Sequence, residues 1–260
     1  NEPESTARAL TAGIVSRYQD RDRRVFYLQH DRNRNGAAAR NTGLGSSRGR
    51  FVSFLDSDDE YYPGRLEHCV AVLQAHPSMY GAVYTGVDFY RRNKHVGTFD
   101  NPREGRFLVE TLACTFNLGT GSNMFFRKDV LLELEGFDEN FWRHQDYELF
   151  VRFFRHFDIA ALPEVYVRKN NENFNLPTIQ NWIPIKAQYL DKYRNDIMAL
   201  PKCDIDFIFL QNKLDLAEYA LMSRNIRLGN KLYQDAKRFG AIGIRRWARR
   251  LVLSIRAILG

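Results

Sequence analysis

Three carboxylates stand within four residues, at Asp56, Asp58 and Asp59. Negative charges this close repel one another unless a positive group lies among them. A divalent cation such as Mg²⁺ or Mn²⁺ takes oxygen ligands, and such a cation commonly bridges carboxylates to a diphosphate. The alternative is a solvated, inert acidic turn at the end of a strand, because Asp is enriched in turns. The acidic run alone leaves both interpretations open.

Other motifs stand around the acidic run in a fixed order. Residues 36–43 contain Ala-Arg-Asn-Thr-Gly, residues 51–55 are apolar, and Pro-Gly-Arg-Leu-Glu follows at 63–67. Further along, Gly-Phe-Asp-Glu at 136–139 leads to His-Gln-Asp-Tyr-Glu-Leu at 144–149. This series resembles the signature of family 2 glycosyltransferases, whose fold is called GT-A. The resemblance covers residues 1 to about 170 and rests on the order, spacing and context of the motifs.

The resemblance implies a role for each acidic motif. In the family the Asp-x-Asp motif holds a metal ion, so Asp58 is the first expected metal ligand, and Asp56 is expected to bind the metal or the ribose. The family's second acidic motif supplies the catalytic base, which corresponds to Asp146. A single base and direct attack on the anomeric carbon would invert the configuration of the sugar. The alternative for Asp146 is a carboxylate that the dipole of a helix favours at its N-terminus.

Two further candidates for the donor site lie on the expected helix that precedes the acidic run. Arg40 and Asn41 are expected to bind the nucleotide sugar, with Arg40 approaching the diphosphate. The alternative for Arg40 is a surface position on a helix with an ordinary ion pair.

Four residues are weaker candidates for the acceptor side. Gly121 and Ser122 belong to a segment that runs where the family has an acceptor loop, although a plain glycine turn explains them equally. Trp142 could stack on a sugar ring or pack in the core. His144 could bind metal or acceptor, but a lone His more often does neither.

The sequence departs from the family pattern in three places. Gln145 stands where the family normally has Glu before the base, which alters the local charge without removing the base. The segment 1–6 resembles the loop after an Asp-Asp pair, so about forty residues of a family member, with strands that the sheet needs, would precede Asn1. The Gln-x-x-Arg-Trp motif of processive members is absent, which favours addition of a single sugar.

The pattern of apolar residues predicts the elements that must position these groups. Strand-like runs alternate with helical periodicities up to about residue 168, which predicts an α/β sheet with helices on both faces. Strands are expected at 25–28, 51–55, 82–84, 87–90, 123–126 and 160–167, and helices at 5–15, 37–44, 63–73, 129–134 and 146–157. Ligands of such sheets bind beyond the carboxyl ends of the strands, where the acidic run falls.

The chain changes character after about residue 180. Long helical periodicities replace the strand pattern, with helices expected at 183–200, 205–222, 227–239 and 244–259. We therefore divide the chain into a GT-A domain, residues 1–175, and a helical C-terminal extension, residues 176–260. Trp247 and Arg side chains in the last helix predict attachment of 241–260 to an anionic membrane surface, on the cytoplasmic face. The alternative is a helix packed on the body or on another subunit.

Charge and cysteine content exclude several classes of protein. The net charge of the chain is +7, but residues 224–260 carry +9 and residues 1–223 carry −2. A nucleic-acid-binding protein would carry basic and aromatic residues across its body, so we expect no nucleic-acid partner. Three widely spaced cysteines indicate neither a disulfide framework nor a zinc site and fit a reducing cytoplasm.

The main enzymatic alternative is a nucleotidyltransferase that makes nucleotide sugars. Such an enzyme would carry a Gly-rich phosphate loop with Lys or Arg near its start, and the sequence has none there. The favoured interpretation is an inverting, metal-assisted glycosyltransferase that transfers a sugar from a UDP-sugar or related donor to a hydroxyl of a glycan or lipid-linked acceptor.

Overall fold

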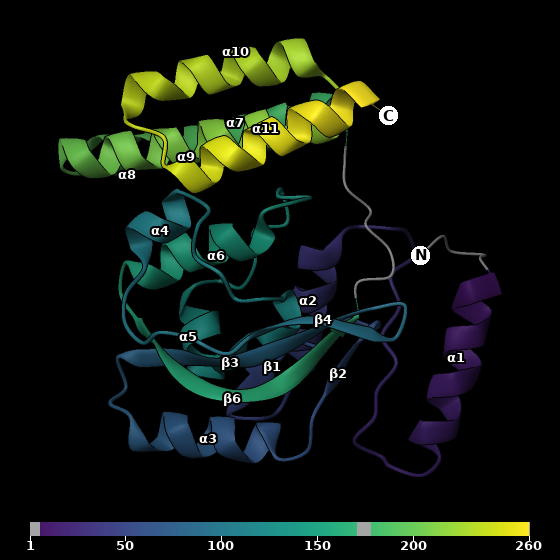
Figure 1. The fold of residues 1–260 in the computed structure, drawn as a ribbon. Coiled ribbons are helices and arrows are strands. Elements are labelled where there is room, and N and C mark those ends of the chain that lie inside the picture. Colours follow the sequence, from purple (N-terminus) through teal and green to yellow (C-terminus); the bar gives the residue numbers. More distant parts are fainter. Residues whose placement is uncertain (1–5, 171–177, 260) are drawn as a thin grey trace.

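The fold is a curled mixed sheet with helices on both faces and a further helical layer above it (Figure 1). The computed structural model describes residues 6–170 and 178–259. Helix α3 lies below the sheet in this view, and helices α4 to α6 lie between the sheet and the C-terminal helices. The mixed α/β fold with C-terminal helices that the sequence predicts is confirmed.

The sheet is mostly antiparallel, with a parallel pair at its centre. The strands run in the order β1-β5-β3-β6-β2, and β4 pairs with β3. Strands β3 and β6 are parallel, with Val83 opposite Ala160, whereas β2 is antiparallel to β6, with Asp59 opposite Lys169. The bounds are β1 Phe51–Ser53, β2 Asp59–Tyr61, β3 Tyr80–Arg91, β4 Lys94–Phe99, β5 Phe125–Arg127 and β6 Asp158–Asn170.

Helices cover the sheet because each presents an apolar stripe to it. Cys69 and Leu73 of α3 are fully buried in a cluster with β3, β5 and β6. Phe150 and Phe153 of α6 pack against Phe126 on the opposite face. The helices of this part are α1 Thr6–Gln19, α2 Gly36–Ser46, α3 Arg65–Ala75, α4 Leu108–Leu112, η1 Gly121–Asn123, α5 Lys128–Glu133 and α6 Gln145–Phe154.

The C-terminal helices share a core with the sheet domain. Tyr189, Tyr193 and Ile208 are buried in one cluster with Leu112 and Val151 from helices α4 and α6. This apolar seam positions the helical layer directly behind α6, the helix that carries Asp146. The helices are α7 Ile179–Lys192, α8 Arg194–Met198, α9 Lys202–Met222, α10 Ile226–Ala236, η2 Lys237–Phe239 and α11 Ile244–Leu259.

Two sequence-based expectations about elements are wrong. Residues 25–28 form no strand, and Phe26 and Leu28 are exposed. A strand needs a neighbour for its backbone hydrogen bonds, and no strand that the structure describes pairs with this segment. The helix expected over 183–200 is two helices, α7 and α8, which meet at Tyr193.

Candidate functional site

Arg40 joins the two acidic motifs that the sequence places 90 positions apart. This residue lies on α2, where its Nη2 donates to Oδ1 of Asp56 at 2.9 Å. Its Nη1 donates to Oε1 of Gln145 at 3.1 Å, and Gln145 precedes Asp146 in the first turn of α6. The fold therefore brings the end of β1 and the beginning of α6 to opposite sides of one guanidinium.

Two glycines make room for this junction. A Cβ at Gly121 would lie 3.3 Å from Nη2 of Arg40, and a Cβ at Gly36 would lie 3.1 Å from Oε1 of Gln145. Both distances are tighter than ordinary van der Waals contact, so a side chain at either position would push the guanidinium or the amide aside.

Asn41 faces a loop of the protein. Its side-chain amide donates to the Phe137 carbonyl at 2.8 Å and to Oε1 of Glu139 at 3.1 Å, and its Oδ1 accepts the Phe137 N–H. The residue thereby fastens α2 to the loop that leads towards α6. Its predicted contact with the donor stays a prediction.

Asp146 lies in the first turn of α6 beside a cavity of about 130 Å³. Residues 116–121 form the opposite wall of this cavity, together with Tyr147 and Phe150. Burial raises the pKa of the Asp146 carboxyl, and the charge of Asp56 adds to the rise. The Tyr147 N–H, which donates to Oδ1 at 2.9 Å, and the Arg40 guanidinium lower the pKa in part. A half-buried carboxyl with a raised pKa beside a cavity is the arrangement that a general base requires.

The three carboxylates of the acidic run point in different directions. Asp56 is partly exposed, and Asp58 is exposed with its carbonyl accepting from the Asn170 amide. Asp59 is buried and turned inwards. Among the residues that the structure describes, no three His, Cys, Asp or Glu side chains lie close enough together to hold a metal ion by themselves. Asp56 and Asp58 thus offer two carboxylates towards solvent, and Asp56 lies beside Gly121, which lines the same cavity as Asp146.

The acceptor-side candidates lie in three different environments. Trp142 is 63% exposed one turn before α6, whereas Ser122 is completely buried, with its hydroxyl bound within the protein. The His144 ring packs against Trp182 and Tyr189 of α7, so it lies in the seam between α6 and the helical layer. Burial lowers the pKa of His144 well below its usual range, and its Nε2 has no hydrogen-bond partner.

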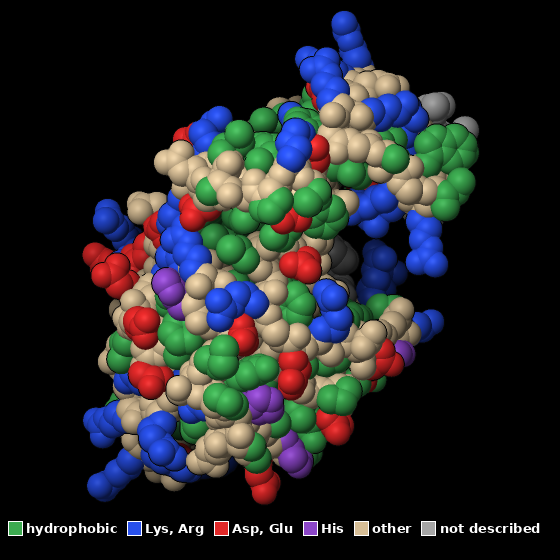
Figure 2. Space-filling model, turned by 90° about the vertical axis from the view of Figure 1, so that its left-hand side faces the viewer, with side chains coloured by type: hydrophobic (Ala, Val, Ile, Leu, Met, Phe, Trp, Pro, Cys, Tyr) green, Lys and Arg blue, Asp and Glu red, His purple; other side chains and the backbone are tan. Residues whose placement is uncertain are grey.

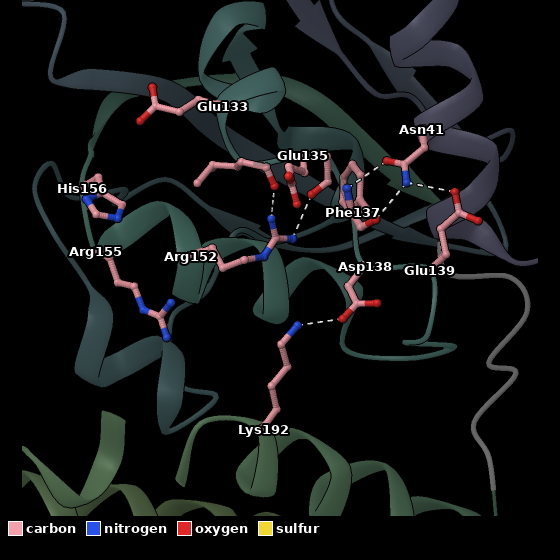
Figure 3. A pocket seen from close by; sticks show the side chains of 12 residues that line it. Asn41, Glu133, Glu135, Phe137, Asp138, Glu139, Arg152, Arg155, His156 and Lys192 are labelled. Carbon is pink, nitrogen blue, oxygen red and sulfur yellow. Dashed lines mark hydrogen bonds and ion pairs between the residues drawn. The ribbon is translucent and has the colours of Figure 1, made fainter. Parts of the chain in front are cut away.

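A larger cavity of about 570 Å³ lies beside the C-terminal half of α6 (Figure 3). Its cations are already engaged, because Arg152 pairs with Glu148, and Lys192 bonds to Asp138 at 2.7 Å. None of the acidic-run residues, nor Asp146, lines this cavity. Several of the residues that the sequence predicts for the site, Asp146 among them, line the smaller cavity or lie near it.

Comparison with known proteins identifies the family of the N-terminal half of the chain. Residues 6–134 match the family described as glycosyl transferase family 2. The chain carries a family 2 glycosyltransferase domain. The match ends before α6, so the family comparison covers α2, Arg40 and the acidic run but leaves the second acidic motif outside.

Relatives of this glycosyltransferase domain include enzymes of archaea and bacteria. An uncharacterized glycosyltransferase of Methanocaldococcus jannaschii is 26% identical over 69% of this chain and 61% of its own length. The amylovoran biosynthesis glycosyltransferase AmsB of Erwinia amylovora is 28% identical over 45% of this chain and 40% of its own length. The chain thus spans about three fifths of the first relative.

The fold of the glycosyltransferase domain is also that of a solved structure. S. aureus TarS 1–349 in complex with UDP-GlcNAc matches 91% of this chain and 78% of its own with a TM-score of 0.56. Sequence identity is 13%, so this likeness concerns the fold. It extends past α6, and it confirms the expected GT-A architecture.

Sequence reasoning assigns no separate role to Asp59 or Gln145. Asp59 belongs to the acidic run. The alternation of side chains along a strand is the signal that could have distinguished it, because it places Asp59 and Tyr61 on one face and Glu60 on the other. The burial of Asp59 and exposure of Glu60 follow this alternation. Gln145 stands out in the sequence only as a departure from the family, and no sequence signal links it to Arg40.

Proposed function

We propose that this chain transfers a sugar from a nucleoside-diphosphate sugar to an acceptor hydroxyl, with inversion at the anomeric carbon. The observation that carries the proposal is the Arg40 bridge between Asp56 and Gln145. The bridge joins Asp56, on the proposed diphosphate side, to Gln145, the residue before the proposed base Asp146, which supports a diphosphate site and a base that lie close together. Transfer with a single displacement needs both groups at once.

In this proposal Asp146 is the base. Its carboxylate takes the proton of the acceptor hydroxyl as the oxygen attacks the anomeric carbon, while the bond to the diphosphate breaks. The 130 Å³ cavity between α6 and residues 116–121 would admit the reacting hydroxyl and exclude bulk water. Arg40 would face the negative charge that grows on the leaving diphosphate.

The outward carboxylates fit a divalent cation bound together with the donor. Mg²⁺ is usually held by one or two carboxylates plus substrate phosphates, and Asp56 and Asp58 provide two carboxylates and no closed cage. A bound Mg²⁺ or Mn²⁺ would neutralise the leaving diphosphate. Because Asp56 also pairs with Arg40 at 2.9 Å, Asp58 is the carboxylate more available to the cation.

The proposed donor is a UDP-sugar, because the TarS structures with this fold contain UDP and UDP-GlcNAc. The proposed acceptor is a glycan or a lipid-linked glycan, and the relative AmsB, named for amylovoran biosynthesis, is consistent with such an acceptor. Trp142, exposed beside the beginning of α6, could stack on the acceptor sugar.

The test of the proposal is sugar transfer or donor hydrolysis by the purified protein across UDP- and GDP-sugars, with and without Mg²⁺ or Mn²⁺. We expect turnover only with the metal, and Asp58→Asn should raise the metal concentration required for half-maximal rate. Turnover that is independent of metal would remove the metal role of Asp58. The anomeric configuration of the product, read by NMR, tests inversion separately.

We also propose that α11 attaches the protein to an anionic membrane surface at the cytoplasmic face. In the structure two arginines of this helix pair with Glu218 of α9: Nη1 of Arg246 bonds to Oε1 of Glu218 at 2.6 Å, and Nε of Arg249 lies 3.0 Å from Oε2. Apolar side chains in the first half of the helix are also exposed, with Ile244 80% and Trp247 50% exposed. The sequence alone leaves open whether such a helix packs through its apolar face or lies on lipid.

This orientation leaves an apolar stripe with Trp available for the headgroup region of a bilayer. Basic side chains project from the helical layer at the top of Figure 2. No helix among the described residues combines the length and apolar character needed to span a bilayer. The attachment proposed for α11 is interfacial.

Liposome co-sedimentation tests the attachment. Deleting 241–260, or combining Trp247→Ser with Leu251→Ser, should release the protein from anionic liposomes. Leu132→Ser removes an equally exposed leucine of α5 and is the matched control, which should leave binding intact. Unchanged binding of the double variant would refute a role for the outward face.

A further inference from the structure

Asp59 is the member of the acidic run that faces away from solvent. Its fully buried carboxylate accepts the hydroxyls of Thr120 at 2.9 Å and Ser122 at 2.7 Å on Oδ2. Oδ1 accepts the backbone N–H of Asn170 at 3.2 Å, and the Lys169 ammonium lies 3.9 Å from Oδ2. Every polar neighbour of this carboxylate is a donor, so the charge is satisfied inside the protein.

The Ser122 hydroxyl links this carboxylate to the Asp56 loop through hydrogen bonds. A hydroxyl has one proton, and Ser122 donates it to Asp59, which leaves its oxygen free to accept. That oxygen accepts the backbone N–H of Asp56 at 2.9 Å. The buried carboxylate therefore fixes the backbone from which the Asp56 side chain reaches towards Arg40.

Thr120 links the same carboxylate to the wall of the cavity beside Asp146. This residue lies in the wall formed by residues 116–121, and its hydroxyl oxygen also caps η1 by accepting the N–H of Ser122 at 3.4 Å. Its proton goes to Asp59. The acidic-run loop and the wall opposite the base are thus held by one carboxylate.

We propose that Asp59 is a positioning residue that sets the distance between Asp56 and Asp146, and hence between the donor diphosphate and the base. The inference rests on the proposed function, because it assigns a geometry to that reaction. A displacement of about 1 Å in reacting groups costs on the order of 100-fold in rate. A support that is fully buried and charged can hold the spacing more tightly than solvent-exposed hydrogen bonds can.

Asp59→Asn is the direct test. The introduced amide keeps the shape but presents one acceptor oxygen and one NH₂ to neighbours that all donate. Either Asn170 N–H meets a donor, or the Ser122 hydroxyl must turn to accept from the amide and weakens its bond with Asp56. We expect kcat to fall about 10- to 100-fold, as for supporting partners of active-site groups. The donor KM should change by less than about threefold, because ground-state binding is kept.

A second readout does not depend on activity. The amide of Asp56 is protected by the Ser122 hydroxyl, so its hydrogen exchange, followed by NMR, should accelerate in Asp59→Asn and in Ser122→Ala. Should Asp59→Asn fail to fold, Ser122→Ala carries the same test. Asp158→Asn is the control: it removes a partly buried carboxylate, paired with Arg106 at 2.8 Å, from the other end of β6. It should leave kcat and Asp56 exchange unchanged.

The outcomes separate the inference from the function on which it rests. Wild-type protein that transfers no sugar from any donor would overturn the proposed function, while the exchange rates would still report on the network. Unchanged kcat in Asp59→Asn, or a fall in kcat with unchanged exchange at Asp56, would overturn the positioning role.

Discussion

Asp146 and Glu148 stand two residues apart in the first turn of α6, and replacing each by its amide should have opposite consequences. Asp146→Asn removes the proposed base. General bases contribute about 10²- to 10⁴-fold to rate, so kcat should fall by that factor, which corresponds to about 3–5 kcal/mol in the barrier. Donor binding should be largely kept, because Arg40 and Asp56 are untouched.

The same change should stabilise the fold at neutral pH. Burial raises the pKa of Asp146, so ionising it costs more in the native state than in the unfolded chain. Native stability therefore falls as pH rises from the unfolded pKa through the raised native pKa, by about 1.4 kcal/mol for each pH unit that separates these two pKa values. The amide avoids this cost and still accepts the Tyr147 N–H. For a protein of this size each kcal/mol is worth about 2–4 °C in Tm.

Glu148→Gln should do the reverse. Its buried carboxylate bonds to Arg152 at 2.6 Å, to Lys192 at 2.6 Å and to the Tyr193 hydroxyl at 2.9 Å. These partners lower its pKa in spite of burial, so its contribution is present above the unfolded pKa and is lost as pH falls through the lowered native value. Breaking a buried pair costs about 3–5 kcal/mol, so Tm should fall by roughly 10 °C.

Thermal melts between pH 4 and 8, combined with single-turnover rates, distinguish the two carboxylates. Asp146→Asn should raise Tm at pH 7, and the gain should vanish towards pH 4, where the wild-type carboxyl is protonated. A lower Tm of the Asp146→Asn variant at pH 7 would show that burial does not raise the pKa of the Asp146 carboxyl. A rate within about tenfold of wild type would exclude it as the base.

Two further predictions concern groups near and far from the site. Arg40→Met should move the acidic limb of the kcat/KM profile to higher pH, because the Arg40 charge lowers the pKa of Asp146. Arg106→Met, which breaks a distant ion pair with Asp158, is the control and should not move the limb. An unchanged limb in both variants would show that the Arg40 charge does not act on the base. Thiol titration with a disulfide reagent at pH 8 should label exposed Cys203 quickly and Cys69 only on unfolding, because Cys69 is buried and burial raises the pKa of its thiol to about 11. Rapid labelling of a variant that combines Cys114→Ser with Cys203→Ser would contradict this.

The strongly patterned segments could be predicted from sequence. The apolar residues 51–55, followed by the acidic run, indicated the strand end at the site, and the helical periodicities indicated α2, α6 and α9. The segment 25–28 shows the limit of this reasoning. Four strand-forming residues describe a strand only when another strand lies beside them, and pairing is not written in the local sequence.

The sequence by itself determined which chemistry was available: carboxylates at 56–59, an Arg-Asn pair on a helix and a carboxylate at the beginning of α6. Only the tertiary structure decided how each group is used. Asp58 and Asp59 are adjacent and chemically identical, yet Asp58 lies in an exposed turn, whereas Asp59 begins β2 on its buried face and is enclosed by donors. Likewise α11 could have packed through Trp247 or through its arginines. The helix packs on α9 through Arg246 and Arg249, because the nearly buried carboxylate of Glu218 requires a cationic partner.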